Sequence, residues 1–264
     1  MRRPMLVDFS NFGYRWFMSK KPVHSIAEEC LANVLSFQKS LACDGTIIIS
    51  DWGKSKFRIE LYPEYKANRK TDDPEKLEKL KKHFSNMNYA LKVLEAYFPC
   101  IKLKGIEADD IIAYLTINKF DNCVILSSDQ DLLQLNRLQF SPNRSDFISL
   151  EKLGFSSIRQ FITAKALAGD NSDNIKGLER VGIKTALKYL IKYDVEHYHD
   201  LKKKIPKKSK SKIEQRILQG EEIVNRNEVL VNLHDFNSKI INRENAEQID
   251  ASLKGHNDLD WLEE

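Results

Sequence analysis

Three short apolar runs in this chain are each followed by an aspartate, and this pattern restricts the fold more than any other feature. The runs and their aspartates are Met5–Val7 with Asp8, Thr46–Ser50 with Asp51, and Val124–Leu126 with Asp129. Continuous apolar runs of this length are typical of strands buried on both faces in a parallel sheet. The carboxyl ends of parallel strands meet at one edge of the sheet, where ligands bind. The sequence therefore predicts an α/β fold with several acids at one edge.

A second group of acids opens the predicted helix that precedes the third strand. Glu107, Asp109 and Asp110 come directly before an apolar helical face. Acids at a helix N-terminus suit its macrodipole, which alone would explain these three. Asp129 and Asp131 after the next strand favour a metal site instead, because carboxylates a few Å apart raise one another's pKa unless a cation neutralises them. Oxygen ligands select Mg²⁺ or Mn²⁺ rather than Zn²⁺.

Charge is distributed unevenly along the 264 residues, whose formal net charge is only +4. Acids gather at strand ends, whereas bases gather in Lys54–Arg69, Lys76–Lys82 and Lys202–Lys212. Any one of these lysine runs is explained as a solvated helix face. Together, around an acidic cluster, they indicate that the metal site acts on a polyanion.

The cysteines lie far apart in apolar contexts and form no Cys-x-x-Cys pair. They are therefore expected to be reduced core residues of a cytoplasmic protein. The sequence shows no signal peptide and no apolar stretch long enough to span a membrane, so we expect no membrane association. At the other end of the chain, Leu259–Leu262 is either a docking peptide or a packed chain end.

Bases alternate with aromatic residues between about residues 53 and 75, where no clean core face is present. Such a segment suits phosphate binding and stacking on bases, and a mobile surface loop is compatible with this function. The candidates for contacts with DNA are Lys54, Lys56, Arg58 and Tyr65. Asp73-Pro74 then predicts the start of a long helix, and Ser25–Glu28 predicts a capping box that opens an earlier one. Ile101–Leu103 predicts a short strand.

The stretch after residue 157 predicts a helix, a polar turn and a second helix. Ser157 to Ala168 is helical in pattern and ends at Gly169, the position expected for a C-terminal glycine. Asp170 and Asp173 follow in a polar loop. The amides after Gly182, with Lys184 and Thr185 beside them, suit a grip on a DNA phosphate. Gly177–Gly182 is not a P-loop, because the full glycine spacing is absent.

Taken together, these residues resemble the 5′ nuclease superfamily of flap endonucleases and 5′→3′ exonucleases. The resemblance is greatest to small bacteriophage members, including the phage ribonuclease H, and covers about residues 5–195. Its motifs, in order, are Val-Asp-Phe-Ser at Asp8, Ile-Ser-Asp at Asp51, Tyr-Lys-Ala-Asn-Arg at Tyr65–Arg69, Glu-Ala-Asp-Asp at Glu107–Asp110, Ser-Ser-Asp-Gln-Asp at Asp129–Asp131, Gly-Asp-Asn-Ser-Asp-Asn-Ile at Gly169–Ile175, and Val-Gly-Ile-Lys-Thr-Ala at Val181–Ala186.

The resemblance implies a role for each matching residue. One metal would be held or surrounded by Asp8, Asp51, Glu107, Asp109 and Asp129. A second would be held by Asp131, Asp170 and Asp173, with Asp110 close to both. Lys66 and Arg69 match helical-arch residues that contact the scissile phosphate, so they are catalytic candidates together with Asp8.

The resemblance also implies a domain organisation and partners. We expect a PIN-like α/β nuclease core, with a mostly parallel sheet flanked by helices, in residues 1–155, including an arch at about 53–75. Residues 156–264 would be a helical DNA-binding region, with a helix-three-turn-helix at about 167–190 that holds K⁺. The partners implied are branched or nicked duplex DNA, RNA–DNA hybrids, a single-strand DNA-binding protein and a sliding clamp. We expect a monomer in the cytoplasm, that of the host if the chain is bacteriophage-encoded. The chain after about Lys202 does not match firmly.

The carboxylates independently favour two-metal hydrolysis of a phosphodiester. One ion would lower the pKa of an attacking water and the other would stabilise the leaving 3′ oxygen. We therefore expect a Mg²⁺-dependent 5′→3′ exonuclease and flap endonuclease, with ribonuclease H-type removal of RNA primers; Mn²⁺ would substitute for Mg²⁺. One alternative is a PIN-like RNA endonuclease, which would lack the arch and the Gly169–Ala186 grip. The other is a non-catalytic DNA-structure-binding protein with a structural metal.

Overall fold

The computed structural model describes residues 3–254 and divides into two compact units. The described residues of the first unit are 3–55, 71–148 and 237–254, and those of the second are 56–70 and 149–236. These units differ from the expected domains in three places. Residues 56–70 of the expected arch and residues 149–155 of the expected core cluster with the second unit, and residues 237–254 cluster with the first. Leu259–Leu262 lies outside the described residues.

The first unit is built on a sheet of order β3-β2-β1-β4-β5-β6, in which only β5 and β6 pair antiparallel. The strands are β1 (Pro4–Asp8), β2 (Gly45–Ile49), β3 (Cys100–Ile101), β4 (Val124–Leu126), β5 (Leu138–Ser141) and β6 (Asp146–Ile148). The mostly parallel α/β fold is thus confirmed, although β3 ends before the predicted Leu103. Asp8 pairs with Ile49, and Val7 with Leu126, so the three acid-bearing strands end level with one another.

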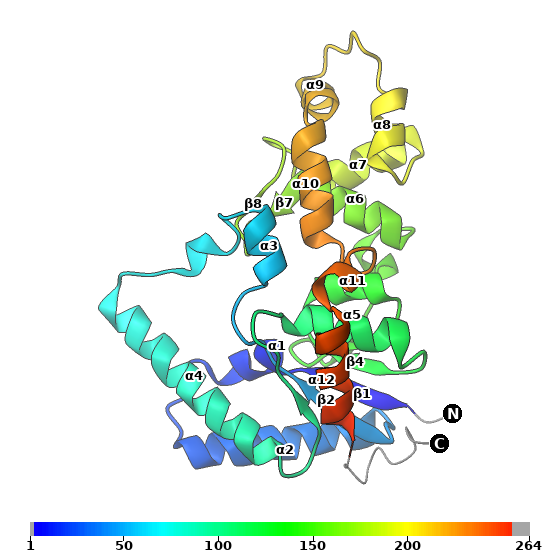
Figure 1. Cartoon of the computed structure of the whole chain (residues 1–264). Coiled ribbons are helices and arrows are strands. Elements are labelled where there is room, and N and C mark those ends of the chain that lie inside the picture. The colour runs from blue at the N-terminus through cyan, green and yellow to red at the C-terminus, as the bar shows by residue number, and fades with distance from the viewer. Residues whose placement is uncertain (1–2, 255–264) are drawn as a thin grey trace. The chain divides into compact units, whose positions relative to one another are not determined.

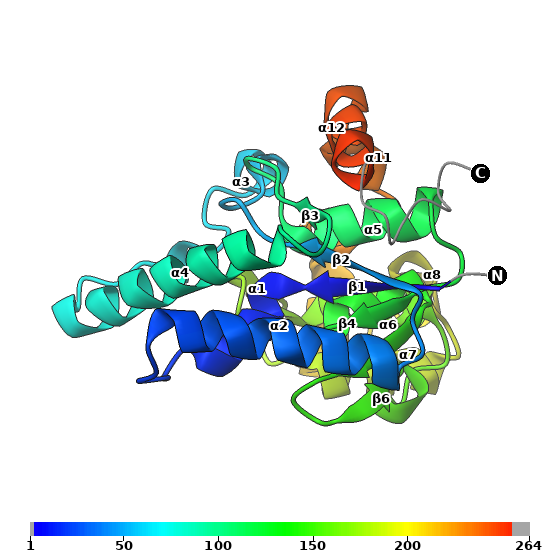
Figure 2. The ribbon, with the colours of Figure 1, turned by 90° about the horizontal axis from the view of Figure 1, so that it is seen from below.

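Both faces of this sheet are covered, because alternate strand residues point to opposite sides. Met5, Val7 and Ile48 belong to a buried cluster with apolar residues of α2 (Val23–Ser40) and α4 (Pro74–Leu94). Helix α5 (Ala108–Asn118) contacts β1 and β2, and Figure 2 shows it on the face opposite α2. The sheet is therefore held rigidly between helices, and the aspartates at its carboxyl edge have a fixed frame.

Two helix starts were predicted in this unit, and the start of α4 is confirmed whereas that of α2 is wrong. Asp73 caps α4 by accepting from the backbone of Glu75 and Lys76, as predicted. The capping box at Ser25 is wrong, because α2 begins at Val23 after Pro22, whose φ of −57° already suits a helix start. The remaining helical elements are α1 (Phe9–Gly13), η1 (Tyr14–Trp16), η3 (Gln130–Leu135), α11 (Asn237–Ile240) and α12 (Arg243–Leu253).

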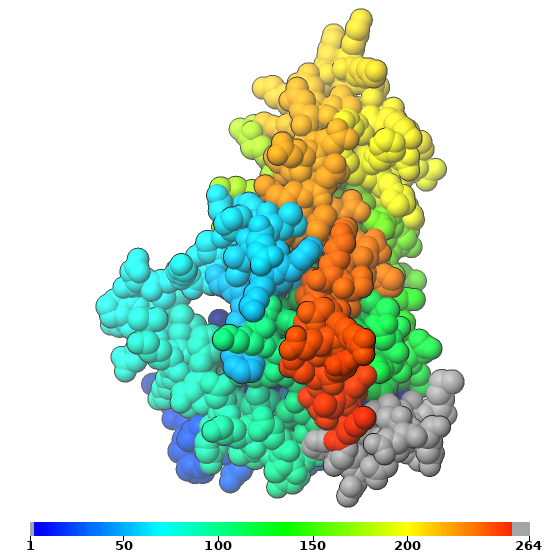
Figure 3. Space-filling view, viewed as in Figure 1, coloured from blue at the N-terminus to red at the C-terminus, as the bar shows by residue number. Residues whose placement is uncertain are grey.

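The second unit is helical apart from one small hairpin. Its elements are α3 (Lys56–Leu61), η2 (Ala67–Arg69), η4 (Glu151–Leu153), α6 (Ile158–Ala168), β7 (Gly169–Asp170), β8 (Ile175–Lys176), α7 (Ile183–Tyr193), α8 (Tyr198–Lys204), α9 (Lys212–Gln219) and α10 (Glu221–Val231). Ser157 caps α6 and Gly169 ends it, as the sequence predicted. Helix α3 lies against α10, as Figures 1 and 3 show. Within residues 3–254, no helix is long and apolar enough to cross a membrane.

Candidate functional site

Asp8 is the most deeply buried of the three strand-end aspartates, with 2% of its surface exposed. Its Oδ1 accepts from the backbone N–H of Asn11, which makes it the N-cap of α1, and its Oδ2 accepts from the Ser127 hydroxyl at 2.8 Å. Burial and the nearby charges of Asp51 and Asp129 together raise the pKa of Asp8 to about 7, although these two hydrogen bonds lower it. The three predicted strand-end aspartates therefore do gather at one place.

Asp51 connects the end of β2 to the start of α5. Its Oδ1 accepts from the backbone N–H of Ala108 at 2.7 Å, in the first turn of that helix. Glu107 is the N-cap residue of the same helix, and both it and Asp110 are buried. The N-terminus of α5 thus attracts carboxylates, as its dipole predicts, and places them beside the edge of the sheet.

Asp129 is fixed by the turn that follows β4. Its Oδ1 accepts from the backbone of Asp131 at 2.9 Å, so it caps η3, and its own N–H donates to Ser127 Oγ. Ser127 therefore bonds to both Asp8 and Asp129 and holds them at a set separation. This serine was not predicted as a site residue. Its place between an apolar strand and two acids could have indicated that role.

The acidic edge fits a divalent cation by the chemistry of its donors. Within residues 3–254, no three His, Cys, Asp or Glu side chains are arranged as a metal site. All the donors are oxygens, which suit a hard ion. Burial raises the pKa of Asp8, and so does repulsion from Asp51 and Asp129, which a bound cation would relieve. The donor set therefore fits.

In the second unit, Asp170 and Asp173 lie on the β7–β8 hairpin, which the sequence did not predict. The hairpin depends on two glycines: a Cβ on Gly169 would lie 2.3 Å from the backbone of Gly177, and a Cβ on Gly177 would lie 2.1 Å from that of Ala168. Gly169 also has a φ of +70°, which side chains disfavour. Only glycine at both positions allows this close approach.

Asp170 pairs with a buried lysine that the sequence analysis did not single out. Lys165 on α6 places its Nζ 2.8 Å from Asp170 Oδ2. Burial alone would raise the pKa of Asp170, but the Lys165 charge and hydrogen bonds from Lys165 and Ser172 outweigh it and lower the pKa to about 2. Asp170 is thus held ionised. A lysine on the buried face of an otherwise apolar helix was the signal for this pair.

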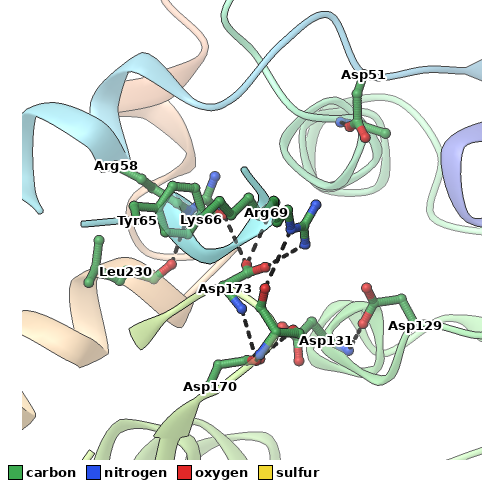
Figure 4. Close-up of polar contacts among 12 residues, drawn as sticks. Asp51, Arg58, Tyr65, Lys66, Arg69, Asp129, Asp131, Asp170, Asp173 and Leu230 are labelled. Carbon is green, nitrogen blue, oxygen red and sulfur yellow. Dashed lines mark hydrogen bonds and ion pairs between the residues drawn. The ribbon is translucent and has the colours of Figure 1, made fainter. Parts of the chain in front are cut away.

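Asp173 is the point on which the residues of the predicted arch converge (Figure 4). Arg69 Nη2 lies 2.7 Å from Asp173 Oδ1, and Lys66 Nζ lies 3.6 Å from Oδ2. The Tyr65 hydroxyl donates to the same Oδ2 at 3.0 Å. The two cations predicted to contact a phosphate therefore point at one carboxylate of the hairpin.

The main chain of the arch segment is bonded to the hairpin as well. Lys66 has left-handed backbone angles, φ 53° and ψ 23°, and its N–H donates to the carbonyl of Asp173 at 2.8 Å. Asn68 donates to the carbonyl of Asn171, and Asn174 donates to that of Glu64. These bonds make residues 64–69 part of the second unit and set the direction of both cations.

The other predicted DNA contacts of this segment differ in exposure. Lys56 is exposed and Lys54 half-buried, whereas Tyr65 and Arg58 are buried. The Arg58 Nε donates to the carbonyl of Leu230 at 3.0 Å. Arg58 is therefore not placed for the surface contact with DNA that its basic context predicted, because its side chain is turned into the unit.

The start of α7 carries the predicted phosphate grip. Gly182 is its N-cap, with no side-chain cap bond, and a Cβ there would meet nothing within 4 Å. Gly182 and Lys184 are exposed and Thr185 is half-buried. Open amides at a helix N-terminus beside an exposed lysine suit a phosphate, and the contact itself stays a prediction.

Comparison with known proteins yields two matching family models and close relatives. Residues 3–151 match the 5′-3′ exonuclease N-terminal resolvase-like domain, and residues 157–249 match the 5′-3′ exonuclease C-terminal SAM fold. The flap endonuclease of Escherichia phage T5 is 33% identical over 251 residues, covering 89% of this chain and 84% of that protein. A 5′-3′ exonuclease of Buchnera aphidicola is 34% identical over 210 residues, covering 72% of this chain and 70% of that one.

Two solved structures of the phage T5 protein are also similar to this chain. One is the T5 5′-exonuclease with bound divalent metal ions (zinc), with a TM-score of 0.85. The other is the T5 flap endonuclease in a pseudo-enzyme-product complex with DNA and metal ions, with a TM-score of 0.83. In both cases the identity is 29%, and 100% of each chain is covered.

Proposed function

Because this chain belongs to the 5′-3′ exonuclease family, and is thus a hydrolase of phosphodiester bonds, we propose that it is a Mg²⁺-dependent flap endonuclease and 5′→3′ exonuclease. Its substrates would be branched or nicked duplex DNA and RNA–DNA hybrids with a 5′ end. The observation that carries the proposal is the burial of Asp8 beside the charges of Asp51 and Asp129. Such crowding is costly without a cation and is typical of a catalytic metal site.

We propose one set of carboxylate ligands for each of two metal ions. The ligands of the first ion all lie in the first unit, and they are Asp8, Asp51, Glu107, Asp109 and Asp129. The second would take Asp131, Asp170 and Asp173, with Asp110 close to both, and this assignment is supported by the motif resemblance alone. Within the second unit, the lowered pKa of Asp170 keeps that carboxylate ionised.

Residues of the protein itself have two further roles in the proposed mechanism: they orient the metal ligands and they stabilise charge on the phosphate. When bound, divalent ions supply a water of lowered pKa and stabilise the leaving 3′ oxygen. Asp8 and Asp51 bind through carboxylates that Ser127 and Ala108 already orient. Lys66 and Arg69 offset the charge that develops on the phosphate, and Asp173 keeps both aimed in the same direction.

Lys184→Ala is expected to weaken duplex binding and to reduce the slope of log K against log[salt] by about 1, because one phosphate contact would be lost. The side chain is exposed at the start of α7. Anisotropy titrations of a flap duplex at several salt concentrations measure this. Lys39→Ala, an exposed lysine of the first unit, is the control. An unchanged slope for Lys184→Ala would argue against the phosphate contact.

The decisive test of the function is cleavage of a flap duplex labelled at its 5′ end, with Mg²⁺ and with EDTA, and with product lengths read from both ends. Metal-dependent release from the 5′ side supports the proposal. Binding without product would support the non-catalytic alternative, and cutting confined to single-stranded RNA would support the RNA endonuclease. Primer removal, bound K⁺, a single-strand DNA-binding protein and a sliding clamp are parts of the proposal supported by the resemblance alone.

A further inference from the structure

Arg58 is a buried charged side chain whose place in the fold calls for an explanation other than contact with DNA. It is 3% exposed, and its Nε donates to the carbonyl of Leu230 near the end of α10. Its guanidinium carbon lies 6.0 Å from the centre of the Tyr65 ring (Figure 4). A charge is buried in a protein only where partners satisfy it, at a cost in desolvation. A residue held in this way acts on its neighbours inside the unit.

One neighbour of Arg58 is Tyr65, which precedes the left-handed turn at Lys66. The Tyr65 ring packs in a buried cluster with Ile162, Ile175 and Leu230, and its hydroxyl donates to Asp173. Left-handed backbone at a non-glycine residue is strained and persists only where the surroundings determine it. Here the Asp173 carbonyl holds the Lys66 N–H, and the buried ring holds the residue before it.

A displaced Tyr65 ring would therefore release the turn and redirect both Lys66 and Arg69. Lys66 Nζ also lies 5.0 Å from the centre of that ring, so ring and amine are in direct contact. We infer that Arg58 is a positioning residue: it fixes Tyr65, Tyr65 fixes the turn, and the turn aims the two cations. The catalytic part of this inference rests on the proposed function, whereas the structural part does not.

The same unit contains a matched comparison in Arg226. Its guanidinium carbon lies 4.4 Å from the centre of the Tyr62 ring, and its Nη2 donates to the carbonyl of Lys176 and to Asn227. Arg226 thus makes the same kinds of contact as Arg58 but with a different tyrosine. Methionine at either position removes the charge and the donors while keeping an unbranched stem.

The first experiment needs no nuclease activity: hydrogen exchange of residues 64–70, measured by mass spectrometry in EDTA. R58M is expected to speed exchange there by about tenfold or more, and R226M by less than about twofold, because only the first opens the turn. R58K keeps a charge and a donor for the Leu230 carbonyl and should lie between them. Equal exchange in R58M and wild type would overturn the inference.

The second experiment is a double-mutant cycle on flap cleavage at saturating substrate and Mg²⁺. R58M is expected to lower kcat by about 10–100-fold through misplacement of Lys66 and Arg69, with flap Kd within about threefold of wild type. In a K66A/R69A background the same change should cost less than about twofold, because it acts through these two cations. If R58M costs as much kcat in the alanine background as in the wild type, or if R226M loses as much kcat as R58M, the cause is a general structural defect and the inference is overturned.

Two further outcomes also have a defined meaning: an R58M protein that does not fold, and a wild type that cuts no substrate. If R58M does not fold, R58K goes through the same cycle with an expected kcat loss of about fivefold, because lysine lacks the planar fork of arginine. An R58K loss that persists in the K66A/R69A background would contradict positioning through these two cations. If the wild type cuts no flap or 5′ end, the proposed function fails, while the exchange comparison still decides whether Arg58 holds the turn.

Discussion

Asp8→Asn is expected to reduce cleavage by about 10³-fold or more while making the metal-free protein more stable. Loss of a metal ligand removes several kcal/mol of transition-state stabilisation, and each 1.36 kcal/mol is about tenfold in rate. Asparagine can still cap α1 through its side-chain oxygen, in place of the bond that Asp8 accepts from Asn11. The folded state would lose a charge that burial and its neighbours Asp51 and Asp129 disfavour.

The pH dependence of the stability gain follows from the raised pKa. In the folded protein Asp8 titrates at about 7, above its ordinary value of 3.8, so its ionisation costs stability as the pH rises between these values. The stability advantage of Asp8→Asn should therefore be absent below about pH 4 and complete above about pH 7, where it is on the order of 4 kcal/mol. Urea unfolding in EDTA at pH 5 and pH 8 measures it.

The control for this prediction is Asp121→Asn, because the Asp121 side chain is 96% exposed and pairs only loosely with Arg137. It should change neither cleavage nor unfolding by a measurable amount, as expected for an exposed ion pair. An Asp8→Asn protein that is less stable than wild type at pH 8 would mean that the hydrogen bonds to Asn11 and Ser127 outweigh the crowding.

Lys66→Ala is expected to lower kcat by about 10²–10³-fold while leaving flap affinity within a few-fold, because its amine would act on charge that develops in the transition state. The side chain is only 10% exposed and is aimed at Asp173, so it is already held in place. Single-turnover cleavage and anisotropy separate the two effects. Lys70→Ala, at an exposed and extended position in the same segment, should cost less than about threefold.

A second substitution at this position separates the amine from the backbone. Lys66→Gly should be as inactive as Lys66→Ala but more stable by about 1 kcal/mol, because glycine adopts the left-handed angles without strain. Equal stability of the two variants would show that the turn stores no strain. Cleavage by either variant at the wild-type rate would remove Lys66 from the proposed mechanism.

The gathering of Asp8, Asp51 and Asp129 could be predicted because it depends on local pattern. Each follows an apolar strand, and parallel strands bring their carboxyl ends to one edge whatever the loops between them do. The cap of α4 at Asp73 and the end of α6 at Gly169 were equally local, since both are set by bonds within one turn. The start of α2 was missed because Pro22 and Ser25 are both acceptable helix starts.

The partners of the arch segment could not be predicted in the same way. Arg58 was expected at the surface because basic residues in such a segment are usually solvated. The carbonyl that accepts its hydrogen bond belongs to Leu230, 172 residues away in sequence. The Lys165–Asp170 pair is close in sequence, but it forms only because the hairpin turns Asp170 back toward α6.

Local residue patterns were enough to predict the α/β class, the acids at strand ends and the family to which they point, because each depends on residue types within a few positions of one another. The packing of distant segments was needed to show that residues 56–70 join the second unit and that Lys66 and Arg69 both meet Asp173. It also decided that Arg58 is buried. These outcomes depend on which distant surfaces pack together, and packing is set by the shape of the whole unit rather than by any local pattern.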